Sequence, residues 1–360
     1  MNKKFWSIFV VAIILLTVGV FAYEDAEGVS SLYIQSIECP SDIMNYATSN
    51  ATRFIRSIDE ESILSYDGVR VGMPFTYGDD VENMFTFPVF SNEEVVYTLR
   101  VAYAPDGDVN GTISTFLVDE LNEYIGRTSL EEPLTFKVDD DSLIACLGEE
   151  TDIVFVFPDD ESVSNSENSR AIGENTLETV NVMDYLDIDL NWQSARDPMH
   201  NIALSRTEYQ SGNNWCSAYV TAAILRTQNG GNLTAKQVMQ YYYGSNVSTS
   251  QSLPMALAAA YARDVGGLTA TTYSTRKLSN SDLMAQIDDD CPVYLCMENL
   301  TTDGYHAIAL RGYTMSNTMW SVWNPSNKKM AYESFEFGGD YVSSLGNTFS
   351  YDGRTIYNYY

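Results

Sequence analysis

The segment WCSAYVTAAILRT, residues 215–227, constrains the fold of this chain more than any other. Its pattern predicts a helix that is apolar on nearly every face, and such a helix must be covered on all sides. The following NGGN, residues 229–232, marks its end, because glycine favours helix termination. The chain must therefore build a domain around this one buried helix.

The region around that segment, residues 180–360, predicts helices first and strands second. Further helices are predicted at residues 234–244, 253–267 and 279–290, the last with Asn280 or Ser281 near its N-cap. After Cys291 the pattern changes to alternating and β-branched runs. The predicted strands cover residues 292–298, 306–314, 319–325 and 349–360. This order predicts a helical half followed by an antiparallel sheet half.

The N-terminal block, residues 30–157, has a different organisation. One helix is predicted over TISTFLVDELNEYI, residues 112–125, from its helical spacing of apolar residues. It lies between β-rich runs that are separated by turn-forming stretches. These runs cover residues 84–90, 94–104, 133–138 and 151–157. The block is therefore predicted to be α+β, with the helix packed against a few antiparallel strands.

The first 22 residues predict a secretory signal peptide. Lys3 and Lys4 precede an apolar run of 18 residues, and Val20-Phe21-Ala22 puts small residues where a signal peptidase cleaves. An uncleaved membrane anchor is the alternative, because 18 residues is close to the length that spans a bilayer. No second run of that length follows, so we expect no membrane contact after cleavage.

Acidic residues dominate the chain, whose formal net charge is −29. Residues 23–170 carry a net −24 and residues 171–360 a net −7. Such a surface repels nucleic-acid phosphates and anionic lipid, which excludes nucleic acid as an expected partner. The asymmetry indicates two units with different tasks, and the alternative explanation is solubility in an extracellular setting.

The segment PDDESVSNSENSRAIGENTLET, residues 158–179, predicts an exposed linker. It has no aromatic residue and consists mostly of Asp, Glu, Ser, Asn and Gly, a composition that proteases cut readily. The predicted organisation is therefore a signal peptide, an acidic α+β block, a linker and a C-terminal domain. Their boundaries are residues 1–22, 23–157, 158–179 and 180–360.

The five cysteines leave at least one thiol unpaired. Cys291 and Cys296 lie on one predicted strand, whose length separates them too far for a disulfide, and are interpreted as small core residues. Cys39 and Cys146 are a candidate pair, but spacing does not decide it. With two histidines and no Cys-x-x-Cys, we expect neither a zinc site nor a cofactor.

Cys216 stands at the start of the buried helix, where unpaired N–H groups favour a thiolate. A nucleophilic cysteine also needs an imidazole base, a group that orients it, and donors for the oxyanion. His306 at a strand start and Asn324 at the end of the next strand are candidates for the first two. Gln210, six residues before Cys216, is the candidate oxyanion donor beside the Cys216 backbone N–H.

Each of these residues has a structural interpretation when taken alone. A lone cysteine in an apolar helix usually packs as a small hydrophobe, and Asn-Pro after a strand is usually a turn. His200 is the rival base, but it lies in a polar stretch just after the predicted linker. The four residues in this order, on these elements, favour the catalytic interpretation.

The motifs QSGNNWCSAYVTAAIL, YHAIALRGY and VWNP resemble those of the staphopain family of secreted bacterial papain-like cysteine peptidases. They lie between residues 210 and 325, and a weaker resemblance runs from about residue 190 to the end. The resemblance implies a papain-like domain at 180–360, with Cys216 as nucleophile, His306 as general base and acid, Asn324 as orienting residue and Gln210 as oxyanion donor. Tyr305 departs from the glycine that the family usually has there, which predicts a narrower cleft on the primed side.

The resemblance also implies a zymogen, whose propeptide of half-barrel, cystatin-like form inhibits the enzyme within the same chain. The linker, residues 158–179, is then the expected activation region, and the mature enzyme is expected to start between about residues 170 and 200. The expected function is a secreted, extracellular and monomeric cysteine endopeptidase that acts on protein or peptide substrates. Two alternatives stay open. One is a cell-wall peptide amidase or transglutaminase-like acyl transferase on the same fold, and the other is a non-catalytic surface binding protein.

Overall fold

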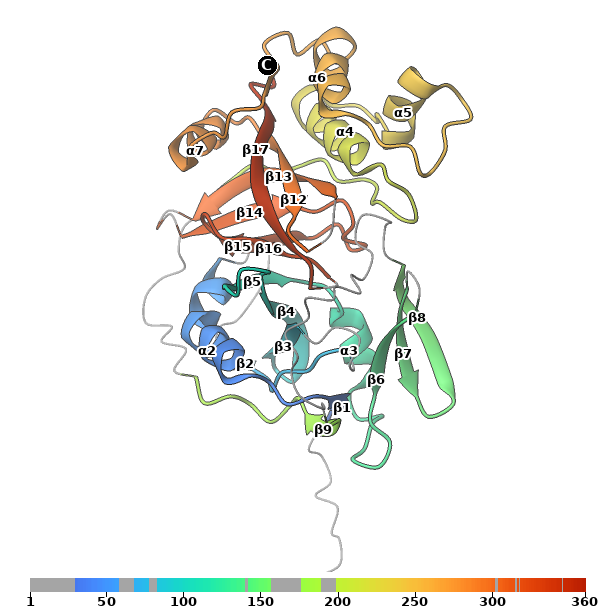
Figure 1. Ribbon diagram of the computed structural model, residues 1–360, viewed down its shortest axis with the longest axis vertical. Coiled ribbons are helices and arrows are strands. Elements are labelled where there is room, and N and C mark those ends of the chain that lie inside the picture. Colours follow the sequence, from blue (N-terminus) through green and yellow to red (C-terminus); the bar gives the residue numbers. More distant parts are fainter. Residues whose placement is uncertain are drawn as a thin grey trace, which may run out of the picture.

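The computed structural model describes residues 30–57, 68–77, 83–139, 142–156, 176–188, 199–301, 304–314, 316, 318–344 and 346–360. The predicted signal peptide and residues 158–175 of the predicted linker lie outside this range. In Figure 1 the C-terminal half forms the upper part of the molecule and the N-terminal block the lower part. No helix in the described ranges has the length and apolar character needed to cross a bilayer.

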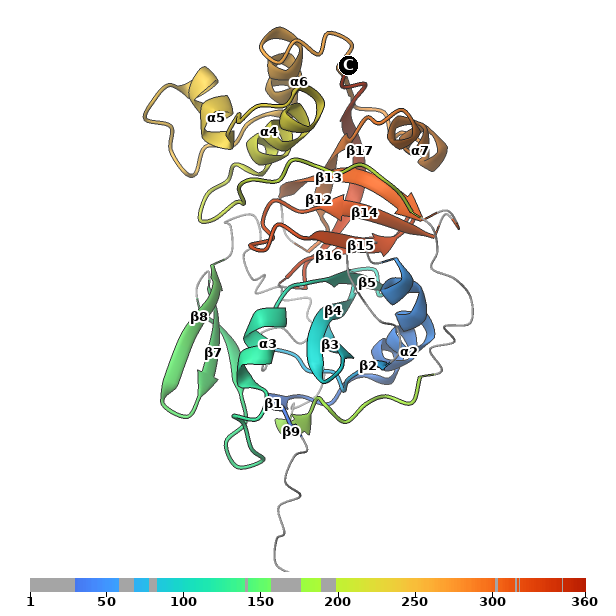
Figure 2. The same ribbon diagram turned by 180° about the vertical axis from the view of Figure 1, so that it is seen from behind.

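The helices of the C-terminal half lie above and beside its sheet in both views (Figures 1 and 2). Their bounds are α4 Cys216–Asn229, α5 Ala235–Tyr243, α6 Met255–Asp264 and α7 Asn280–Asp288, close to the predicted ranges. The N-cap of α7 is the residue just before Asn280 and Ser281, which were predicted to lie near it. Ser279 caps this helix, because its hydroxyl accepts from the Asp282 N–H while the Asp282 carboxylate accepts from the Ser279 N–H in a capping box.

The sheet of the C-terminal half is antiparallel, with β11-β17-β12-β13-β14-β15 as its strand order. β10 pairs with β13 and β16 with β17 outside this path. The bounds are β10 Met199–Asn201, β11 Thr272–Ser274, β12 Val293–Asn299, β13 Tyr305–Thr314, β14 Met319–Trp323, β15 Tyr332–Glu336, β16 Tyr341–Val342 and β17 Thr348–Tyr357. The four predicted strands are confirmed as β12, β13, β14 and β17, whereas β10, β11, β15 and β16 were not predicted.

The central strands are buried on both faces, which explains their continuous apolar runs. On β12, Tyr294 and Cys296 pack with α4 in one hydrophobic cluster. The alternate residues Val293, Leu295 and Met297 pack with α7 in another. The sheet is therefore the middle layer, and α4 lies on one face of it.

The N-terminal block is built from helices and antiparallel strands, as predicted. Its elements are β1 Tyr33–Ser36, α2 Ser41–Arg56, β2 Val69–Val71, β3 Met84–Ser91, β4 Glu94–Tyr103, β5 Val109–Ser114, α3 Val118–Tyr124, β6 Thr135–Asp139, β7 Ser142–Leu147 and β8 Glu150–Val156. The predicted strands correspond to β3, β4, β6 and β8. The helix α2, which packs Phe54 and Ile55 into the block's core, was missed.

The helix predicted over residues 112–125 was wrong in its first part. Thr112 to Ser114 belong to β5, because the turn at residues 104–108 returns the chain antiparallel to β4 and pairs Val109 with Tyr103. Helix α3 starts only at Val118, after Leu117 in a left-handed conformation. Strand pairing with β4 therefore overrides the helical spacing there.

Two strand pairings connect the halves in a way that the sequence did not predict. β5 pairs with β15 through Ser334–Ile113 and Phe335–Thr112, so one sheet runs through both halves. β9, Glu178–Asn181, pairs with β1, and the next residue, Val182, is buried in the N-terminal core. Residues 178–183 therefore pack with the N-terminal block, while the boundary at residue 180 stays a prediction. This mixed architecture of helices and antiparallel sheets is compatible with a papain-like peptidase domain.

Gly312 offers a test of how β10 is attached. A Cβ at this position would lie 1.9 Å from Asn201 Oδ1 and 2.5 Å from the His200 carbonyl oxygen, so β10 would have to move away from β13. We expect Gly312→Ala to lower the free energy of unfolding in urea by about 1–3 kcal/mol. Gly304→Ala is the matched control: a Cβ there meets nothing within 4 Å, so the change should stay within about 0.5 kcal/mol. Equal stability of the two variants would show that β10 does not pack as described.

Candidate active site

His306 and Asn324 are brought together by the pairing of β13 with β14. Ala309 lies opposite Trp323, so the antiparallel register places Ile308 opposite Asn324, just past the end of β14. His306 shares a face with Ile308, because side chains alternate along a strand. The two side chains are diagonal neighbours, and the His306 Nε2 to Asn324 Oδ1 distance is 2.9 Å. Both residues are buried.

The neighbours of Asn324 determine how its amide is oriented. The backbone N–H of Ser326, which can only donate, lies 2.9 Å from Asn324 Oδ1. Asn324 Nδ2 donates in turn to the Tyr341 hydroxyl at 2.6 Å. Because the oxygen accepts from His306, Nε2 must carry a proton, and Nδ1 is the basic nitrogen of the neutral ring.

Gln210 lies on a loop that is attached to the same turn. Its backbone N–H donates to the Pro325 carbonyl at 2.7 Å, and its side-chain Oε1 accepts from the Ser326 hydroxyl at 3.4 Å. Its Nε2 donates to the Asn213 carbonyl at 2.5 Å, which uses one of the two amide protons. Gln210 is buried and held against the turn that follows Asn324, with a second amide proton left for another acceptor.

Cys216 is the first residue of α4, as predicted. The preceding turn is fixed by Asn213, whose side-chain oxygen accepts from the Trp215 N–H at 3.1 Å. Cys216 packs in the same buried cluster as Ala307, which follows His306, and Trp323, which precedes Asn324. The first N–H groups of a helix have no acceptor within it, so the position favours negative charge.

Cys296, on β12 opposite Ala307, is a second thiol near this region. Burial raises its pKa well above the usual range, and the charge of Asp352 adds to the effect, with a smaller contribution from Cys216. Burial also raises the pKa of Cys39, to about 12, with Asp42 and Glu178 acting in the same direction. Both thiols stay protonated near neutral pH. All five cysteines are free, so Cys39 and Cys146 form no disulfide, and the interpretation of Cys291 and Cys296 as buried core residues is confirmed.

The rival base His200 lies elsewhere. It is on β10 opposite Tyr313, and its Nδ1 is 2.7 Å from Asp288 Oδ1 on α7. Tyr305, just before His306, is half exposed, and the guanidinium of Arg354 lies 4.0 Å from the centre of its ring. Within the described ranges no group of three or more His, Cys, Asp and Glu side chains could hold a metal ion.

Three residues that sequence reasoning missed complete the surroundings of Asn324. Ser326 holds its amide oxygen, Tyr341 accepts from its amide nitrogen, and Glu333 accepts from the Tyr341 hydroxyl at 2.8 Å. Ser326 has a local signal, because it follows Asn-Pro in the predicted turn. Tyr341 and Glu333 have none, since loops and strand pairing alone place them beside Asn324.

Comparisons with known proteins agree with the predicted resemblance. The sequence model of the Peptidase_C39 like family matches residues 186–345. Staphopain B of Staphylococcus aureus strains NCTC 8325 / PS 47 and COL is 21% identical over 267 residues, and staphopain B of strain MRSA252 is 20% identical. Each alignment covers 66% of this chain and 66% of the relative, so the chain spans about two thirds of the length of these curated relatives. The similarity to staphopain is confirmed, and the comparisons support a cysteine peptidase.

Asn324→Ala tests the hydrogen bonds at this position. The change removes the acceptor of the buried Ser326 N–H and the donor to Tyr341, and an unsatisfied buried group costs about 1–3 kcal/mol. We expect the free energy of unfolding in urea to fall by about that amount. In Asn229→Ala, the control, only an exposed bond to the Gly266 carbonyl is lost, so a smaller change is expected. Equal losses in the two variants would mean that Asn324 is not held as described.

Proposed function

We propose that this protein is a secreted cysteine endopeptidase, made as a zymogen, which hydrolyses peptide bonds through an acyl-enzyme. The hydrogen bond between His306 and Asn324, beside a buried Gln210 and the helix that Cys216 starts, is the observation that carries the proposal. Similarity to staphopain B supports the reaction class.

In the first step, the thiolate of Cys216 attacks the carbonyl carbon of the substrate peptide bond. A new S–C bond forms, and the carbonyl oxygen becomes an oxyanion. The second amide proton of Gln210 and the backbone N–H groups at the start of α4 are the donors proposed to stabilise it. When the C–N bond breaks, the proton held at Nδ1 of His306 passes to the leaving amine.

In the second step, His306 Nδ1 accepts a proton from a water molecule, which attacks the thioester carbon. The S–C bond breaks, the carboxylic acid product leaves, and the thiolate–imidazolium pair is restored by the proton on His306. Asn324 keeps the imidazole in one tautomer throughout, because its oxygen holds Nε2–H. This step distinguishes a hydrolase from an acyl transferase, in which an amine replaces water.

The N-terminal block is proposed to be an inhibitory propeptide of half-barrel, cystatin-like form. Its attachment to the peptidase half supports this role. Strand β5 continues the sheet through β15, the Val342 N–H donates to Thr112 Oγ1 at 2.8 Å, and the Ser334 hydroxyl donates to the Ser57 carbonyl at 3.1 Å. Removal of the block would release a monomeric, extracellular enzyme that acts on protein or peptide substrates.

Cys216→Ala tests the proposed nucleophile. We expect the variant to lose hydrolysis of casein and self-processing entirely, because no other group forms the acyl-enzyme. Cys291→Ala is the control, since this thiol is buried in the same half and outside the proposed machinery, and it should keep both activities. Casein hydrolysis by Cys216→Ala would contradict the proposal. A wild type that cleaves only muropeptides would favour the cell-wall amidase instead.

The position of the activation cut follows from β9. Residues 178–188 are attached to the N-terminal block, by β9 with β1, by the Val182 N–H to the Leu32 carbonyl, and by the Leu186 N–H to the Val71 carbonyl. A cut before β9 would leave these contacts tethering the block to the enzyme. We expect Edman sequencing of the processed protein to start between residues 189 and 199. A start before residue 178 would contradict this expectation.

A further inference from the structure

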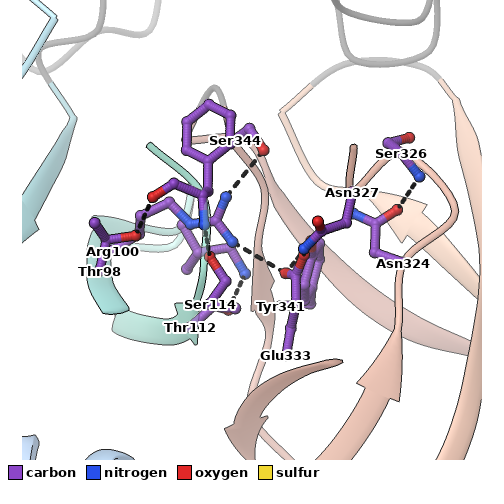
Figure 3. Close-up of polar contacts among 12 residues, drawn as sticks. Thr98, Arg100, Thr112, Ser114, Asn324, Ser326, Asn327, Glu333, Tyr341 and Ser344 are labelled. Atoms are coloured by element: carbon purple, nitrogen blue, oxygen red, sulfur yellow. Dashed lines mark hydrogen bonds and ion pairs between the residues drawn. The ribbon is translucent and has the colours of Figure 1, made fainter. Parts of the chain in front are cut away.

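A buried ion pair joins the two halves of the chain. One terminal guanidinium nitrogen of Arg100, on β4, is 3.1 Å from Glu333 Oε2 on β15. The other terminal nitrogen donates to the Ser344 hydroxyl at 2.9 Å. Figure 3 shows Arg100 extending from the N-terminal strands to these two residues of the C-terminal half. The side chains of Arg100 and Glu333 are 0% and 3% exposed. Both charges are therefore held away from water.

Glu333 is connected through Tyr341 to the proposed catalytic pair. The Tyr341 hydroxyl donates to Glu333 Oε2 at 2.8 Å and accepts from Asn324 Nδ2 at 2.6 Å. Asn324 Oδ1 accepts in turn from His306. The other carboxylate oxygen, Oε1, accepts from Asn327 Nδ2 at 2.9 Å, which holds the carboxylate in place.

The three hydrogen bonds that connect His306, Asn324, Tyr341 and Glu333 all have the same donor-to-acceptor direction. His306 donates to Asn324, Asn324 donates to Tyr341, and Tyr341 donates to Glu333. Aligned donors polarise one another, so the negative charge at the end of the chain makes Asn324 Oδ1 a better acceptor. A better acceptor stabilises the imidazolium form of His306. Arg100 opposes this effect, because its positive charge lies against the same carboxylate.

Stability alone gives a weak reason for this arrangement. A buried ion pair costs much of its attraction in desolvation and is often no more stabilising than apolar residues of similar size. A second ion pair crosses the same boundary, Arg53 on α2 with Glu336 on the same strand β15, and it is partly exposed. The buried pair differs from it by its connection to Asn324.

We propose that Tyr341 and Glu333 are positioning residues for the pair His306 and Asn324. We also propose that Arg100 of the N-terminal block offsets the negative charge of the Glu333 carboxylate, which ends this series of hydrogen bonds. The proposal rests on the proposed function for its catalytic meaning. Its structural content is independent: Arg100 of the N-terminal block acts on His306 through Glu333, Tyr341 and Asn324. When the block leaves, the carboxylate loses its counter-charge and the imidazolium is favoured.

Other groups that titrate or carry charge also lie around His306, and they stay the same in every variant compared below. They belong to α4, β12 and β17, the elements that flank its strand end, and to Tyr305 beside it. Among the described residues these groups include Cys216, Tyr294, Cys296, Glu298, Tyr305, Tyr351, Asp352 and Arg354. A difference between variants therefore reports the change made at Arg100, Tyr341 or Glu333.

The experiment is a histidine titration by NMR in the full chain. The chain has only two histidines, so selective labelling of histidine shows one signal for His306 and one for His200, assigned with His200→Gln. A Cys216→Ala background keeps the N-terminal block attached. We expect Glu333→Gln and Tyr341→Phe to lower the His306 midpoint by about 0.5–1 pH unit, and Arg100→Gln to raise it by a similar amount.

Two control variants match these changes. Tyr313→Phe removes a hydroxyl on the same strand as His306, which donates to Asp288 Oδ1 at 2.6 Å beside His200, so the His306 midpoint should stay unchanged. Arg53→Gln breaks the ion pair with Glu336 across the same boundary and should leave the His306 midpoint unchanged. Arg100→Lys keeps the charge and should restore the wild-type midpoint.

The proposal is tested by the His306 midpoint, which should rise in Arg100→Gln and fall in Glu333→Gln. A purely structural pair would weaken folding in both Arg100→Gln and Glu333→Gln and shift the His306 midpoint in one direction or not at all, which would overturn the proposal. Tyr341→Phe keeps the ring packed, so an unchanged midpoint in this folded variant overturns it even where the charge variants do not fold. Failure of the proposed function would be seen in a different measurement: the wild type would show no hydrolysis that depends on Cys216.

Discussion

The burial of α4 on all sides is the constraint on which the rest of the structure depends. The helix packs on a face of the sheet where β13 presents Ala307 and Ala309, and α6 presents Ala258, Ala259 and Ala262 to the same cluster. Small side chains allow close approach of the helix on both sides, and a helix so enclosed has no freedom to rotate or slide. Its first residue, Cys216, is consequently held in one place relative to the strand that begins next to His306.

Enclosure of the helix places polar groups where water does not reach, and each then requires a partner. Asn324 meets this requirement with three bonds, to His306, Ser326 and Tyr341. The same residue therefore fixes the imidazole of His306, the turn to which Gln210 is hydrogen-bonded, and the Tyr341 hydroxyl that donates to Glu333. The carboxylate of Glu333 is in turn matched by Arg100. A single polar network thus runs from the proposed catalytic histidine to the N-terminal block.

Sequence reasoning succeeded where a local pattern decides the structure. The apolar run of α4, the helices that follow it, and the central strands β12, β13 and β14 were all predicted, because periodicity is read within one segment. It failed at residues 112–114, where pairing with β4 overrides a helical spacing, and at α2, whose many Ser, Thr and Asn residues give a weak helix signal. The short strands β9 and β10 depend on partners far along the chain, and β15 and β16 are too short for a local pattern to mark them.

The sequence by itself determined the order of Gln210, Cys216, His306 and Asn324 and the elements that hold the last three, since Cys216, His306 and Asn324 each lie at an end of a segment with a clear period. Only the tertiary structure decided the orientation of the Asn324 amide, the tautomer of His306 and the attachment of the N-terminal block through β5, β9 and Arg100. Arg100 and Glu333 are 233 residues apart, and two charges so distant in the chain meet only when folding aligns their strands. Local propensity says nothing about such a contact, because its free energy depends on burial and on neighbours that come from both halves of the molecule.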